Sequence, residues 1–149
     1  MKQFRYRLET VLSYKTQVLE DLRVQHAAAL HLVNKKKEEI DGLNRQMDQF
    51  CAGLDEKKQS GSAIEEMQLY DMCISRMENI IQNEKEKLAD LKGKEKKKKE
   101  EVIRANVDAA RYEKLKDRRF REYCQAEQKE QETFIEEFVN HVGQSGRDK

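Results

Sequence analysis

Apolar residues recur along the first part of the chain at alternating intervals of four and three residues. This spacing places them on one side of a helix and is typical of the seam of a coiled coil. The pattern predicts a first helix over about residues 4–57. Its apolar seam positions are Phe4, Leu8, Val11, Val18, Leu22, Ala29, Val33, Ile40, Leu43, Met47, Phe50 and Leu54.

The pattern stops between Asp55 and Ala63, where Gln59-Ser60-Gly61-Ser62 supplies small and flexible residues. Such residues are typical of a chain reversal, so we expect a turn at about 58–61. Ser62 and Glu65 have the S-x-x-E spacing of a capping box, in which the two side chains accept hydrogen bonds from free backbone amides. The spacing predicts that a second helix starts at Ser62.

A second seam runs without a break in phase from Met67 to Ala126. It predicts a helix over about 62–140, followed by a disordered tail at 143–149. A short connection makes consecutive helices antiparallel. The predicted fold is therefore all-α: one domain over 1–149, a long two-helix antiparallel coiled-coil hairpin whose second helix overhangs the N-terminus.

Polar residues within the two seams favour this antiparallel arrangement. It places Glu84 near Lys35 and Lys36, and Lys98 near Asp21, so that opposite charges meet. Such pairs stabilise weakly, and we expect them mainly to fix the register of the two helices.

Composition separates this chain from a compact enzyme. It has no Pro and no Trp, 40% of its residues are charged and 37% are hydrophobic. A two-helix coiled coil offers no sheltered pocket for catalysis, and His26, His31 and His141 have no evident partner residues. Cys51, Cys73 and Cys124 lack metal-ligand spacing. We therefore expect no enzymatic activity, no cofactor and no metal site.

Charge and hydropathy also bear on location and on nucleic-acid binding. The net charge is +1 with the two signs interspersed, and no segment has the ~20 apolar residues that span a bilayer. A cytoplasmic protein without membrane insertion is expected. The run Lys96–Lys99 resembles a nucleic-acid patch, but Glu100 and Glu101 follow it and no aromatic residues interleave, which favours a solvated helix face.

Two groups of apolar residues lie outside the regular seam. Near the turn, the outer and flanking positions carry Leu69, Met72, Cys73 and Ile80. They form either a docking surface or a widened seam. In the overhang, beyond the first helix, lie Phe120, Tyr123, Phe134, Ile135, Phe138 and Val142. These residues either face solvent or bind a partner, and the spacing of four of Phe134, Phe138 and Val142 suits a hydrophobic socket.

Three stretches of the sequence resemble the flagellar export protein FliJ family. The first is the opening Phe4-x-Tyr6-x-Leu8-x-x-Val11-Leu12-x-x-Lys15, in which Tyr6 replaces a Phe. The second, just after the turn, comprises Tyr70, Ile74, Met77 and Ile81. The third comprises Tyr112, Leu115, Asp117 and Arg118. Together with the length and the hairpin layout, the resemblance covers most of the chain.

The resemblance implies a stalk-like accessory of the flagellar type III export apparatus, related to injectisome stalk proteins. Its implied partners are the hexameric flagellar export ATPase, at the end that carries both termini, and the cytoplasmic domain of the export gate, nearer the turn. Export chaperones are further possible partners. The alternative is a generic coiled-coil adaptor or export chaperone, including an injectisome stalk protein. The implied location is the cytoplasm, peripherally at the inner face of the cell membrane.

Overall fold

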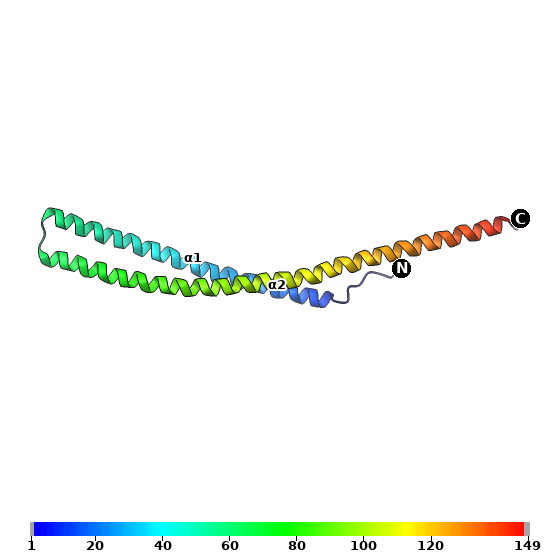
Figure 1. Cartoon of the computed structure of the whole chain (residues 1–149), viewed down its shortest axis with the longest axis horizontal. Coiled ribbons are helices and arrows are strands. Elements are labelled where there is room, and N and C mark those ends of the chain that lie inside the picture. The colour runs from blue at the N-terminus through cyan, green and yellow to red at the C-terminus, as the bar shows by residue number, and fades with distance from the viewer. Residues whose placement is uncertain (1, 148–149) are drawn as a thin grey trace. The chain divides into compact units, whose positions relative to one another are not determined.

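The computed structural model describes residues 2–147, almost all of which lie in two helices. Helix α1 spans Glu9–Ser60 and helix α2 spans Ile64–Arg147 (Figure 1). The two long helices pack against each other, which confirms the predicted all-α helical hairpin.

The local sequence accounts for the length of both helices. No proline interrupts them, and proline in a helix interior removes a hydrogen bond and clashes with the preceding turn. Acidic residues lie in each first turn, and Lys57 and Lys58 lie in the last turn of α1. These charges complement the helix dipole.

The reversal between the helices depends on Gly61, whose φ of 73° is unfavourable for residues with a Cβ. Helix α2 begins at Ile64, later than the predicted Ser62. The predicted capping box is therefore wrong. The carbonyl of Ala63 accepts the first backbone hydrogen bonds, from Glu66 and Met67. The Ser62 hydroxyl donates to the carboxylate of Glu66.

The outer boundaries of the helices also differ from the prediction. Helix α1 begins at Glu9 instead of Phe4. Residues 2–8 form a non-helical segment that lies along α2. We call residues 2–8 the strap. Helix α2 continues to Arg147, so 143–147 belong to a helix rather than to the predicted disordered tail, and 148–149 lie outside the described residues.

The chain divides into two units. The hairpin-tip unit is Glu20–Ile103, and the open-end unit combines Met1–Leu19 with Arg104–Lys149. The buried residues of the hairpin-tip unit are Val33, Ile40 and Ile81, and those of the open-end unit are Leu19 and Ala109. All five are small or aliphatic residues on the predicted seams or beside them, so packing follows the sequence periodicity.

Charged pairs join the helices within the hairpin-tip unit. Lys36 Nζ lies 2.7 Å from Glu84 Oε2, which confirms the predicted neighbourhood of Glu84. Hydrogen bonds from Lys36 and then Lys87 lower the pKa of Glu84. Lys98 donates to Gln25 at 2.8 Å, one helical turn from its predicted neighbour Asp21.

His26 has an interhelical partner that sequence reasoning did not find. Its Nε2 lies 2.8 Å from Glu95 Oε1, and both side chains are about three-quarters covered. The expectation that His26 lacks a partner is therefore wrong. The pair occupies one polar layer of the coiled coil, where each side chain satisfies the other.

The open-end unit contains two further interhelical ion pairs. Lys15 Nζ lies 2.7 Å from Asp108 Oδ2, and Lys116 Nζ lies 2.8 Å from Glu9 Oε2. In each case the hydrogen bond to the carboxylate raises the pKa of the lysine. These pairs hold the first turns of α1 against α2, next to the point where the strap joins α1.

Candidate partner-binding surfaces

The first candidate surface lies in the hairpin-tip unit beside the turn. A cavity of about 440 Å³ is lined by Phe50, Lys57, Glu66, Leu69, Tyr70 and Cys73. Of the residues predicted for this surface, Leu69 and Met72 are 61% and 68% exposed, and Ile80 is also exposed. Cys73 is half-buried and is one of the residues that line the cavity.

Gly53 shapes this surface by admitting the ring of Tyr70. A Cβ atom at Gly53 would lie 2.9 Å from Tyr70 Cε1, closer than real Cβ contacts allow. The absence of a side chain on α1 therefore lets the ring cross the seam and form part of the cavity wall. No sequence pattern indicated this contact, because a glycine within a helix can have several causes.

The charged rim of the cavity comes from both helices. Lys57 Nζ lies 3.5 Å from Glu66 Oε2. The hydrogen bond from Ser62, followed by the charge of Lys57, lowers the pKa of Glu66. Glu66 thus stays ionised beside Lys57 and gives the apolar cavity a polar edge on the side of the turn.

The second candidate surface lies in the open-end unit, where the strap crosses α2. The ring centroid of Phe4 lies 5.3 Å from that of Phe120 and 5.6 Å from that of Tyr123. The hydroxyl of Tyr123 donates to the carbonyl of Lys2, and that of Tyr6 donates to the carbonyl of Tyr112 at 2.9 Å. The strap is therefore held by aromatic packing and by two hydrogen bonds.

These contacts correct the prediction for Phe120 and Tyr123. Both were expected to have no partner within the chain, but both contact Phe4. Burial, followed by the charge of Glu127, raises the pKa of Tyr123 above its ordinary value. The seam spacing correctly indicated that Phe4 packs against the second helix. It did not indicate that Phe4 lies in a non-helical segment.

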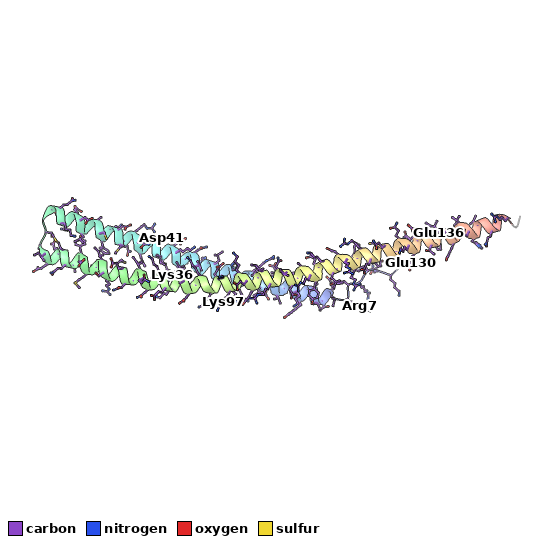
Figure 2. The ribbon with its side chains drawn as sticks, in the orientation of Figure 1. Arg7, Lys36, Asp41, Lys97, Glu130 and Glu136 are labelled. Carbon is purple, nitrogen blue, oxygen red and sulfur yellow. The ribbon has the colours of Figure 1, made fainter. Side chains whose placement is uncertain are left out.

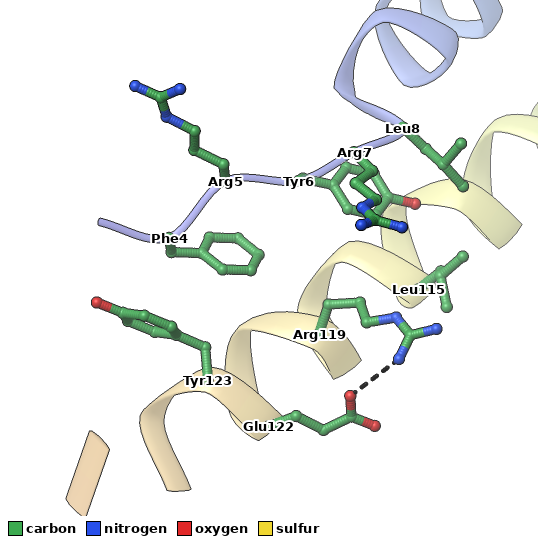
Figure 3. Close-up of a pocket in the computed structure, with 9 residues that line it drawn as sticks. All are labelled: Phe4, Arg5, Tyr6, Arg7, Leu8, Leu115, Arg119, Glu122 and Tyr123. Carbon is green, nitrogen blue, oxygen red and sulfur yellow. Dashed lines mark hydrogen bonds and ion pairs between the residues drawn. The ribbon is translucent and has the colours of Figure 1, made fainter. Parts of the chain in front are cut away.

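A cavity of about 690 Å³ lies between the strap and α2. Its walls include aromatic and aliphatic side chains, together with the guanidinium groups of Arg7 and Arg119. Figure 3 shows Phe4 opposite Tyr123, Arg119 paired with Glu122, and Arg5 directed away from the other labelled side chains. The site joins apolar walls to positive charge, a combination suited to an apolar group carried on an acidic segment.

The third candidate surface is the end of α2. Five large apolar side chains are exposed within nine residues: Phe134, Ile135, Phe138, Val139 and Val142. Phe134 is 69% and Phe138 is 60% exposed. Their positions agree with the predicted overhang stripe, and Val139 extends the set that the sequence indicated.

Within residues 2–147, neither a metal site nor a membrane-spanning helix is found. Among residues 2–147, no three His, Cys, Asp or Glu side chains converge in a way that could hold a metal ion. Over the same residues, neither helix has a stretch that combines the length and hydrophobicity needed to cross a bilayer.

Comparison with known proteins gives one family match. The family described as "Flagellar FliJ protein" matches residues 4–144. No curated protein and no solved structure matches the chain. The match includes all three stretches that carried the resemblance, and the structure brings the first and third together through the hydrogen bond from Tyr6 to Tyr112.

Proposed function

Because the chain belongs to the FliJ family, and so is a component of the flagellar protein export apparatus, we propose that it is a non-enzymatic stalk. In this role it couples the hexameric export ATPase to the cytoplasmic domain of the membrane export gate. It supports flagellum assembly from the cytoplasm, held at the inner face of the membrane by these partners. Export chaperones are further candidate partners.

The observation that carries the proposal is the exposed apolar stripe at the end of α2. Phe134 and Phe138 each leave well over half of their surface to solvent in the free chain. A helix that presents such a stripe is suited to insertion into a hydrophobic groove or socket. The central opening of a ring-shaped ATPase is the partner surface that we assign to it.

The gate is assigned to the hairpin-tip unit. There, exposed Leu69 lines the cavity together with Phe50 and Tyr70, and Met72 is exposed three residues further along α2. Methionine adapts its shape to varied partners, and contiguous exposed apolar groups tend to mark a docking surface. The two assignments lie in different units, so they can be tested by separate substitutions.

The test for the ATPase is co-purification of the full chain with the hexameric enzyme, combined with measurement of ATP turnover. We expect a complex and a higher turnover than for the ATPase alone. If the chain binds unassembled export subunits but neither binds the ATPase nor changes its turnover, the chain is an adaptor or chaperone and the stalk proposal fails.

The test for the gate uses Leu69→Asp combined with Met72→Asp. Because both side chains are exposed, helix content should be unchanged, and gate affinity should fall by about tenfold or more, as expected when apolar anchors are replaced by charge. ATPase binding should be retained. Ile81→Asp is the control for core damage, because Ile81 is buried. If the double variant loses as much thermal stability as this control, then Leu69 and Met72 support the fold rather than a partner.

A further inference from the structure

Charge is segregated along α2 in the open-end unit, although the chain as a whole has interspersed charges. Residues 111–121 contain six basic and two acidic side chains. Residues 122–142 contain six acidic side chains and one basic side chain. The strap adds Lys2, Arg5 and Arg7 to the basic part and no acidic residue. This unit therefore has one basic and one acidic region.

An apolar cavity lies between the strap and α2, where the basic region meets the first residues of the acidic region. Phe4, Tyr6 and Leu8 of the strap face Leu115 and Tyr123 of α2 around a volume of about 690 Å³. This volume lies within the range of roughly 300–1,000 Å³ that is usual for ligand pockets. Arg5, Arg7 and Arg119 also line the cavity. Glu122 is the one acidic residue of the lining, and it pairs with Arg119, so the lining keeps a positive net charge.

The acidic region contains the exposed apolar stripe. Glu132, Glu136 and Glu137 flank Phe134 and Phe138, and every residue from 128 to 147 is exposed. The side chains of Glu130 and Glu136 project from this part of α2 (Figure 2). An aromatic side chain carried between carboxylates is the type of group that the cavity of the basic region is suited to accept.

We propose that two copies of this chain associate through their open ends, with the acidic end of α2 from one copy lying on the strap and basic region of the other. A ring of Phe134 or Phe138 enters the cavity, and Glu136 and Glu137 lie near the arginines of the strap. The contact is mutual, so both copies donate one acidic end and accept one.

Charge complementarity selects the occupant and its orientation. In an antiparallel arrangement the basic region of each copy meets the acidic region of the other, whereas a parallel arrangement would align like charges. A two-fold contact also uses the same patches twice, which is the usual way in which identical chains form closed dimers. The contact between the two copies covers the apolar stripe that we assign to the ATPase, so one copy cannot bind the ATPase and a second copy through this stripe at the same time.

The test is analytical ultracentrifugation of the full chain with a reducing agent present, so that the exposed Cys124 cannot form a disulfide. At low salt we expect a concentration-dependent monomer–dimer equilibrium. The equilibrium should shift towards monomer at about 0.5 M salt, where the screening length falls to roughly 3–5 Å. The measurement contains no ATPase, so its outcome does not depend on the proposed stalk function.

Charge-reversed variants test the pairing directly. Arg5→Glu with Arg7→Glu, and Glu136→Lys with Glu137→Lys, should each weaken self-association by about tenfold or more, because each places like charges at both contacts. An equimolar mixture of the two double variants should associate again, because every contact in the mixed pair is then complementary. Lys97→Glu with Lys99→Glu is the matched control: both residues are exposed in the hairpin-tip unit, and the net charge changes by the same amount as in the arginine variant.

A chain that stays monomeric at low salt up to several hundred micromolar would overturn the proposal. Self-association that the Lys97/Lys99 control weakens as much as the strap variant would also overturn it, since net charge and not the pairing would then be responsible. Failure of the mixture to associate has the same consequence. Circular dichroism verifies that each variant keeps its helices, which we expect because the strap is non-helical and Glu136 and Glu137 are exposed.

Discussion

Replacing Phe134 and Phe138 with Ala should separate partner binding from folding. The two rings project from the end of α2 and are 69% and 60% exposed in the free chain. If the ATPase buries them, the variant must lose this interaction while the free protein remains nearly unchanged.

The magnitude follows from the exposed fractions. Complete burial of a Phe side chain is worth about 1.5–3 kcal/mol, and about two-thirds of each residue remains to be buried. Each ring can then contribute about 1–2 kcal/mol on binding. Because about 1.4 kcal/mol corresponds to a tenfold change in affinity, the double variant should bind the ATPase at least about tenfold more weakly. The contributions of two neighbouring rings do not simply add, so the upper limit of the loss in affinity is less well defined than the lower limit.

The free variant should melt almost normally. Surface substitutions away from packed contacts usually change the free energy of unfolding by less than about 0.5 kcal/mol, and Ala is a better helix former than Phe. Isothermal titration calorimetry with the ATPase and thermal melting of the free chain measure the two effects separately. ATPase affinity should be measured at low micromolar concentrations of the chain, so that self-association does not compete.

Tyr14→Ala provides a matched control, because Tyr14 is 65% exposed and is an aromatic residue of the same open-end unit. It should leave ATPase affinity within about twofold of the original, since less than ~0.5 kcal/mol is expected for an uninvolved surface residue. Unchanged affinity of the Phe134 and Phe138 variant, together with a clear loss of stability, would refute the reasoning. The end of α2 would then pack on its own chain.

Three further predictions concern stability in the hairpin-tip unit. Gly93→Ala should raise the free energy of unfolding by up to about 1 kcal/mol through helix propensity, because no atom lies within 4 Å of the new Cβ. Gly53→Ala should instead lower the free energy of unfolding, because its Cβ meets Tyr70 at 2.9 Å and overpacking costs about 1–3 kcal/mol; urea unfolding compares the two, and equal stabilisation would disprove the close approach. The pKa of Glu84 is lower in the folded chain than its usual value of 4.5. The ionised carboxylate therefore adds to the free energy of unfolding above pH 4.5, and this contribution is lost as the pH falls through the lower folded pKa. Glu84→Gln should therefore reduce the acid dependence of melting below about pH 4.5, and an unaltered pH profile would show that Lys36 does not stabilise the ionised carboxylate.

The sequence pattern predicted two long helices and the reversal between them, but not where each helix begins and ends. Apolar residues at a spacing of three and four, with no proline, leave few alternatives to long amphipathic helices, and the Ser-Gly-Ser segment is the point where the seam stops. Periodicity also identified the neighbourhood of Lys36 and Glu84 and the exposed stripe of Phe134 and Phe138. These features depend on which face of a helix a residue occupies, and that face follows directly from its position in the sequence.

The path of the strap depends on tertiary packing, because a heptad pattern indicates that a residue packs but not the backbone conformation in which it does so. Phe4 satisfies the seam pattern, yet it reaches Phe120 and Tyr123 from a non-helical segment. The pairing of His26 with Glu95 and the fit of Tyr70 over Gly53 likewise depend on the axial register of the two helices and on side-chain direction. A shift of one helical turn in register changes such contacts without altering the apolar pattern, which explains why the sequence did not reveal them.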